Sequence, residues 1–171
     1  MQEIYVENIR EVIRGKKLIQ KELDVKITNK GKNVFVDGDA DDEYIALEVL
    51  EAVNAGFSID SALVINEEGM MLQRVHIKDI TKREDLDRVR ARIIGKKGKT
   101  LATLGNLTNC RVSLQDNEIG LIGEAETMDD AVQAVTSLIQ GSKQGNVYSR
   151  LERESKKKRL RKKDEIKNEL K

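Results

Sequence analysis

The chain has 171 residues, enough for one medium-sized domain or for two small ones of about 70 to 85 residues each. Aromatic residues make up only 3% of it, so any core must be aliphatic. The chain has a single cysteine and a single histidine, which excludes a disulfide framework, a zinc finger or ribbon, and most histidine-based catalysis. The formal net charge is +1, no apolar run approaches the roughly 18 residues of a membrane span, and the N-terminus is unlike a signal peptide, so we expect a cytoplasmic protein with no membrane partner.

Residues 1–56 predict a small domain that mixes short helices and strands. Its apolar residues alternate between helical and strand spacing, with Gly15 as an expected break and Gly56 as the expected stop of the last helix. The predicted elements are a strand at 4–6, a helix from 9 to Gly15, a second short helix at 18–23, strands at 25–27 and 34–36, and a helix at 41–54.

A connector at 57–69 follows, which we expect to be partly helical and capped by Ser58 or Asp60. Residues 70–148 then repeat the first pattern. The predicted elements are a strand around 72–77, helices at 86–94 and 99–108, strands at 111–114 and 118–122, and a helix at 127–140.

The two halves also resemble each other residue by residue. Residues 9–17 align with 89–97 at an offset of 80, and residues 34–40 align with 119–125 at an offset of 85. Two matches in the same order indicate a duplication. The sequence therefore predicts the α+β class, with two tandem copies of a βααββα unit.

The segment Gly95-Lys96-Lys97-Gly98 carries the most specific chemistry. Two glycines let a backbone approach closely, and three lysines at the start of the next helix suit a phosphodiester. Taken alone it could be an ordinary helix–turn–helix corner. A nucleotide-binding P-loop is excluded, because Ile93 occupies the position of its first glycine and the preceding segment predicts a helix.

The run Ile94-Gly95-Lys96-Lys97-Gly98, with Leu101 three residues later, resembles the signature of type I (eukaryotic-type) KH domains. The resemblance implies two tandem type I KH-like domains, each a three-stranded antiparallel sheet with three helices, and a loop that grips about four single-stranded nucleotides. Two such copies before a basic tail, with the segments 106–112 and 145–148, are similar to the Dim/Pno group of small-subunit ribosome assembly factors. That group implies single-stranded small-subunit rRNA as the ligand, with its 3′ end region as the segment held. A partner rRNA-processing endonuclease or another assembly factor is also implied.

The first copy departs from this signature, because Leu18 stands where the second glycine should be. We expect Leu18 to serve the helix core and this domain to act as a brace or a protein contact. The alternative is weak electrostatic contact with RNA through Lys16, Lys17 and Lys21.

The resemblance gives a set of expected RNA-binding residues, with Leu104 and Val112 as groove walls or plain core. Asn106 and Asn109 are expected either to contact RNA or to turn the chain, and Cys110 to be a small buried residue. The expected RNA-binding residues are Ile94, Gly95, Lys96, Lys97, Gly98, Lys99, Thr100, Leu101, Arg111, Lys156, Lys157, Lys158 and Arg159.

The tail at 149–171 is strongly basic. Residues 150–171 hold 11 Lys and Arg against 5 Asp and Glu, a net of +6, which leaves 20 against 25 and a net of −5 for residues 1–149. We expect the tail to continue a helix from Val147 or to become ordered on a polyanion.

No catalytic, metal or cofactor pattern is visible, so the sequence predicts a binding protein that is not an enzyme. Two other functions remain open. One is a protein-interaction scaffold, and the other is a translation factor that binds mRNA with the same chemistry.

Overall fold

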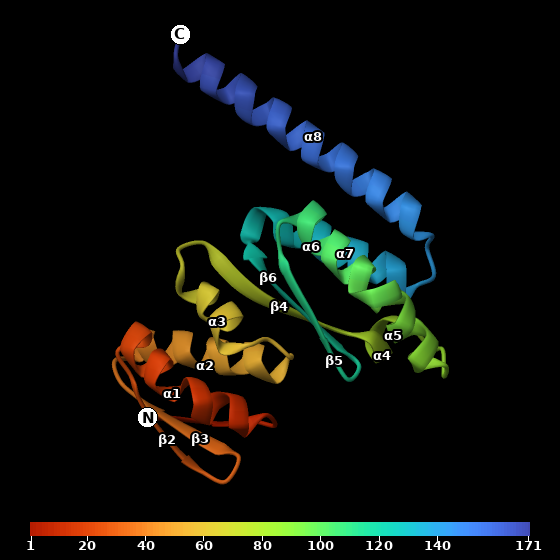
Figure 1. Ribbon diagram of the computed structural model, residues 1–171. Coiled ribbons are helices and arrows are strands. Elements are labelled where there is room, and N and C mark those ends of the chain that lie inside the picture. Colours follow the sequence, from red (N-terminus) through yellow and green to blue (C-terminus); the bar gives the residue numbers. More distant parts are fainter.

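The computed structural model describes all 171 residues, and its two halves each contain one three-stranded sheet (Figure 1). The first half comprises β1 (Gln2–Tyr5), α1 (Ile9–Leu23), β2 (Lys26–Lys30), β3 (Asn33–Asp37), α2 (Ala40–Asn54), α3 (Ile59–Ala62) and the 3-10 helix η1 (Leu63–Asn66). The second half comprises β4 (Met70–His76), α4 (Ile77–Ile80), α5 (Leu86–Ile94), the 3-10 turn η2 (Lys96–Gly98), α6 (Lys99–Thr108), β5 (Arg111–Gln115), β6 (Glu118–Glu124), α7 (Ala125–Ile139) and α8 (Gln144–Glu169).

The two sheets have the same topology, which confirms the predicted α+β class and the duplication. Their strand orders are β1-β3-β2 and β4-β6-β5, and every pairing is antiparallel. The helices after the third strand, α2 and α7, both have 15 residues and keep the offset of 85. The two halves are therefore copies of one unit.

The break expected at Gly15 is absent, and this is the main correction to the predicted elements. Residues 9–23 form one continuous helix, so the first half lacks the second of its two expected short helices and any loop at 15–18. Gly15 lies where α3 crosses α1, and a β-carbon there would lie 2.5 Å from Ile59 Cγ1. The glycine therefore allows close helix packing. Leu18, expected in the core, is 37% exposed.

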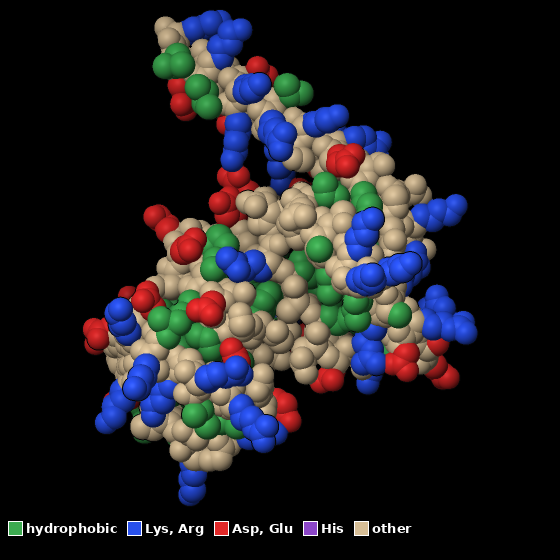
Figure 2. Space-filling view, in the orientation of Figure 1, with side chains coloured by type: hydrophobic (Ala, Val, Ile, Leu, Met, Phe, Trp, Pro, Cys, Tyr) green, Lys and Arg blue, Asp and Glu red, His purple; other side chains and the backbone are tan.

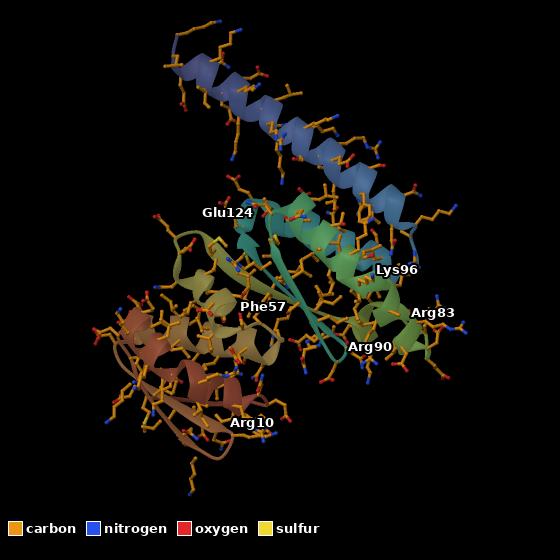
Figure 3. All side chains as sticks on the ribbon, in the orientation of Figure 1. Arg10, Phe57, Arg83, Arg90, Lys96 and Glu124 are labelled. Carbon is orange, nitrogen blue, oxygen red and sulfur yellow. The ribbon has the colours of Figure 1, made fainter.

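The second sheet lies between two cores, because β6 is buried on both faces. Ile119 and Leu121 pack into the second core beneath α5–α7, whereas Ile122 packs into the first core. Phe57 of the connector lies against Gly120 on that same face (Figure 3). The two halves thus share a packed junction.

Polar contacts reinforce this junction. Ser113 Oγ on β5 donates a 2.7 Å hydrogen bond to the carbonyl of Ala55, and Arg74 on β4 forms a 2.8 Å ion pair with Glu51 on α2. The connector is partly helical as predicted, and Ser58 accepts a hydrogen bond from the Ser61 amide at 3.3 Å. Because connector residues belong to the first core, the connector is no flexible linker. The division into domains at 1–56 and 70–148 stays a prediction.

Helix α8 begins against the second half and then leaves it (Figure 1). Its early residues Val147 and Leu151 are buried in the second core, whereas the residues beyond Lys158 are all exposed. The 26-residue helix agrees with the expected helical tail and starts three residues earlier, at Gln144. None of the helices combines the length and the apolar character that crossing a membrane requires.

Candidate nucleic-acid interface

The Gly95–Gly98 segment forms a tight turn between α5 and α6, as the sequence predicts. Gly95, Lys97 and Gly98 all have positive φ angles, of 72°, 54° and 73°. The Gly98 amide donates a 3.3 Å hydrogen bond to the Gly95 carbonyl and closes the turn. Because these backbone angles favour glycine, the two glycines fix the path of the loop.

The two glycines serve different purposes. A β-carbon at Gly95 would lie 2.1 Å from Thr100 Oγ1 and 2.8 Å from the Thr100 amide, so Gly95 is needed for packing inside the protein. A β-carbon at Gly98 would meet nothing within 4 Å. The outer surface at Gly98 is therefore open to an approaching ligand.

Positive charge surrounds this open surface. Lys96, Lys97 and Lys99 are exposed, and none of them forms an ion pair. Figure 3 places Lys96 at the outer corner where α5 meets α6. No side chain caps the N-terminus of α6, whose amide groups and dipole favour an anion. The loop can thus hold a phosphate without first breaking a protein contact.

Apolar side chains continue from the loop. Ile94 is 38% exposed, and Leu101 and Val112 are partly buried against the second core. Leu104 is 1% exposed and is plain core, which settles the alternative left open for it. Figure 2 shows hydrophobic side chains gathered over α6 and β5 beside the basic side chains of the loop. This combination suits bases on one side and a backbone on the other.

At the far end of α6, a cleft of about 520 Å³ opens between the two halves. We call it the junction cleft. On one side the cleft is lined by Asn106, Asn109 and Arg111 of the second half. On the other side it is lined by Val64 of the connector and by Met70, the first residue of β4. Arg111 also donates a 3.3 Å hydrogen bond to Ser61 Oγ. Asn109 has a φ of 54° and ends α6, which agrees with the turn-forming role considered for it.

Thr100 lies inside the protein, unlike the other expected loop residues. It is 4% exposed, and its hydroxyl accepts a 3.0 Å hydrogen bond from Gln144 Nε2 at the start of α8. The same amide group donates a 3.1 Å hydrogen bond to the Arg92 carbonyl, and the Arg92 guanidinium donates to the Ser142 carbonyl. The start of α8 therefore holds the ends of both loop helices.

Sequence reasoning missed Gln144 and Arg92 as supports of the loop. Gln144 lies 44 residues from Thr100 and 52 from Arg92, and no local pattern connects them. The nearest signal in the sequence was the segment 145–148, which contributes to the family resemblance and begins one residue after Gln144.

The expected basic residues of the tail divide between two faces of α8. Lys156, Lys157 and Arg159 are exposed, with Lys157 3.3 Å from Glu154. Lys158 instead faces α7, where it forms a 2.6 Å ion pair with Asp130 and donates a 2.7 Å hydrogen bond to the Glu126 carbonyl. The structure thus ties Lys158 to the protein and leaves its neighbours open to solvent.

Other predictions concern single residues. Cys110 is 6% exposed and packs in the second core, as predicted. No group of three or more His, Cys, Asp or Glu side chains lies close enough to hold a metal ion.

Comparison with known proteins agrees with this geometry. Residues 71–156, about half of the chain, match the family model of the eukaryotic-type KH domain (KH domain type I), in its version for the second such domain of PNO1. A KH domain-containing protein of Methanocaldococcus jannaschii is 32% identical over 149 residues, which are 83% of this chain and 66% of that protein. The pre-rRNA-processing protein PNO1 of Coccidioides immitis is 34% identical over 107 residues, 61% of this chain and 42% of that protein. The chain thus spans less than two thirds of these curated relatives.

Two solved structures from Pyrococcus horikoshii share the whole architecture. Dim2p is 31% identical, with a TM-score of 0.82 over 90% of this chain and 99% of that one. A chain of the a/eIF2alpha–aDim2p–rRNA complex is 29% identical, with a TM-score of 0.84 over 91% of this chain and 94% of that one. The family model, the loop geometry and both shared sheets lead to one conclusion: the chain belongs to the type I KH-domain proteins of the Dim/Pno group.

Proposed function

We propose that the protein is a small-subunit ribosome assembly factor that binds RNA and catalyses no reaction itself. Its second KH domain holds a single-stranded segment of small-subunit rRNA. The observation that carries this proposal is the Gly95–Gly98 loop, which combines an open, left-handed backbone with three unpaired lysines at the start of α6.

In the proposed complex, phosphates lie over Gly98 and contact Lys96, Lys97 and Lys99. Bases stack toward Ile94 and Leu101, and Arg111 meets a base at the end of the groove. Lys156, Lys157 and Arg159 add charge from the exposed side of α8. Thr100 and Lys158 act indirectly, because one supports Gly95 and the other ties α8 to α7.

The relatives support the choice of rRNA. The fungal relative is a pre-rRNA-processing protein, and the Pyrococcus complex contains rRNA. The 3′ end region of the rRNA is our proposed segment within it. We also propose a protein partner, either an rRNA-processing endonuclease or another assembly factor, and the initiation-factor subunit in the Pyrococcus complex supports the capacity for such contacts.

Fluorescence anisotropy with a short single-stranded RNA from the 3′ end of small-subunit rRNA tests the proposal. The Lys96→Asp/Lys97→Asp variant should lose at least about tenfold in affinity, because two phosphate contacts become repulsive. A Lys26→Asp/Lys30→Asp variant, which changes the same charge on β2, is the matched control and should retain binding. Equal losses in both variants would show that the loop is not the reader.

A protein-interaction scaffold is the second candidate, and the first half favours it. Its loop is missing altogether because α1 is continuous, and residues 1–149 carry a net charge of −5. A scaffold should keep its protein partner in the Lys96→Asp/Lys97→Asp variant and bind it with little dependence on RNA. An RNA-dependent assembly factor should lose that partner when RNA is digested.

A further inference from the structure

Helix α8 ends in an arm that packs against no other element. Its residues 159–169, which we call the free arm, are all exposed and extend over about 16 Å beyond Lys158. Figure 1 shows α8 starting beside α5 and α6 and ending clear of the rest of the molecule. The match to the KH family model stops at residue 156, so the free arm lies outside the part of the chain that this match covers.

The free arm and the residues just before it carry a dense block of positive charge. Residues 156–163 contain seven Lys and Arg in eight positions, and Leu160 is the exception. A polyanion that neutralises this block would remove repulsion within the helix, because like charges at i and i+4 destabilise a helix. Three such pairs occur here: Lys157 with Arg161, Lys158 with Lys162, and Arg159 with Lys163.

The cations lie on every side of α8, because eight consecutive residues complete about two turns. Lys158 and Lys162 face α7, where they lie 2.6 Å from Asp130 and 3.6 Å from Glu126. Figure 2 shows basic side chains along both edges of the projecting helix. The cations of this block that form no ion pair are Lys156, Arg159, Arg161 and Lys163.

The free arm overhangs the end of the KH groove. A cleft of about 560 Å³, which we call the arm cleft, lies between α8, the start of α7 and the end of α6, and Arg159 and Arg161 line it. Asn109, the residue that ends α6, lines both the arm cleft and the junction cleft. RNA that continues past the end of α6 therefore emerges beside the basic side chains of α8.

The distribution of charge favours helical RNA over a single strand or a protein as the ligand of the free arm. A single strand can follow one side of α8, whereas the two phosphate strands that border a groove of helical RNA can contact opposite sides at once. A protein groove that receives a helix takes apolar anchors along one face, at i, i+3, i+4 and i+7. Leu160 and Ile166, the apolar residues of the free arm, lie about 120° apart around the helix and form no such face.

We propose that the free arm binds the phosphate backbone of a helical RNA segment that adjoins the single strand held by the second KH domain. Arg159, Arg161 and Lys163 contact phosphates of the two strands of this stem. The contact depends on the shape and charge of the stem and does not read its bases. This inference rests on the proposed function, which supplies the single strand, and it gives the protein a preference for single strands that lie next to a stem.

The test compares RNAs that share one single-stranded segment of about 10 nucleotides. The segment is used alone, or joined at its 5′ or its 3′ end to a hairpin with a stem of about 10 base pairs. The arm variant is Arg159→Gln/Arg161→Gln/Lys163→Gln, which removes three unpaired cations and keeps good helix formers at exposed positions.

The matched control is Lys78→Gln/Lys82→Gln/Arg88→Gln, which removes three exposed cations of the second half that lie on and between α4 and α5. Binding is measured by anisotropy with the full-length protein at several salt concentrations. Far-UV circular dichroism and thermal melting first confirm that both variants fold.

At low salt the wild type should bind one of the hairpin RNAs at least about tenfold more tightly than the single strand, and the arm variant should lose most of this preference. The slope of log K against log salt for that hairpin RNA should fall by about 2 to 3 in the arm variant, which is about 0.7 to 0.9 for each lost contact. The control should keep the preference. A wild type without the preference, an arm variant that retains it, or equal losses for the hairpin RNA and the single strand would overturn the proposal.

A labelled poly-glutamate peptide tests the protein alternative. If the peptide binds through the free arm and the wild type shows no preference for a hairpin, the arm is a protein contact and the proposal is wrong. Retention of the single strand by Lys96→Asp/Lys97→Asp would instead overturn the proposed function, so the two failures can be told apart.

Discussion

The side-chain amide of Gln144 donates a 3.0 Å hydrogen bond to the Thr100 hydroxyl and so connects the start of α8 to the helix that follows the KH loop. Thr100 in turn lies directly beneath Gly95, where a β-carbon would meet its hydroxyl. The loop therefore rests on a support that comes from outside the βααββα unit. The part of this chain that matches the family model, residues 71–156, extends past the start of α8 and so includes this support.

Gln144→Ala should lower the free energy of unfolding by about 1–2 kcal/mol, because the Thr100 hydroxyl and the Arg92 carbonyl lose their donor in a partly buried place. Affinity for short RNA should fall with it, since Thr100 is then free to rotate beneath the loop. Urea unfolding and anisotropy check both effects. Asn146→Ala, exposed on the same helix, should stay within about 0.5 kcal/mol, and an equal loss there would contradict this role.

Alanine at the two loop glycines should have opposite consequences. Gly95→Ala should cost about 3 kcal/mol or more, because its β-carbon collides with Thr100 and its backbone angles of 72° and 176° suit only glycine. Gly98→Ala should cost only about 1 kcal/mol, since its angles are left-handed and the space around it is open. Its new methyl group should instead weaken RNA binding. Urea unfolding beside anisotropy separates the two, and similar stability losses would argue against the division.

Much of the second half could be predicted from sequence, because its signals are local. The predicted helices at 86–94 and 99–108 match α5 and α6 at every boundary, where Gly95, Gly98 and Asn109 provide left-handed turns. The strands at 111–114 and 118–122 differ from β5 and β6 only at their ends. Turn residues and hydrophobic period act together there.

The first half shows where local signals fail. Gly15 aligns with Gly95 in the repeat and suggested the same turn, yet its role is set by Ile59, 44 residues away. Tertiary packing thus overrode the helix-breaking tendency of glycine. The support from Gln144 and the inward direction of Lys158 could not be predicted for the same reason, since each depends on a distant partner.

Gly15→Ala should destabilise the protein by about 1–3 kcal/mol, although glycine-to-alanine changes inside helices usually stabilise by about 1 kcal/mol. The added carbon would lie within 3.0 Å of three atoms of Ile59 and force α3 away from α1. Gly145→Ala is the control, because a β-carbon in the first turn of α8 meets nothing within 4 Å. It should be neutral or stabilising. A stabilising effect at both positions in urea unfolding would rule out the packing role of Gly15.

The stability of the protein should depend on pH in part through Asp85, at the start of α5. Arg83 donates hydrogen bonds of 2.9 and 2.8 Å to the two Asp85 oxygens and holds the pKa of that carboxyl below its usual range. A lowered pKa in the folded state gives stability above the ordinary value of about 3.9, which is lost as the pH falls through the folded pKa. Asp85→Asn should therefore have a lower Tm than the wild type at pH 7, and the difference should shrink toward pH 3. A difference that grows at low pH would contradict this sign.

Adjacent residues on β6 should report on the two cores separately. Leu121 packs only into the second core, whereas Ile122 packs into the first core although its strand belongs to the second sheet. Truncation to alanine should cost about 2–5 kcal/mol at either position.

The location of the damage should differ between these two variants. Hydrogen exchange measured by mass spectrometry should increase mainly in α7 for Leu121→Ala. For Ile122→Ala it should increase in α2 and in the connector, which lie across the junction. Identical exchange patterns would mean that the halves do not meet through β6. Distinct patterns would show that β6 contributes to both cores and so joins the two halves.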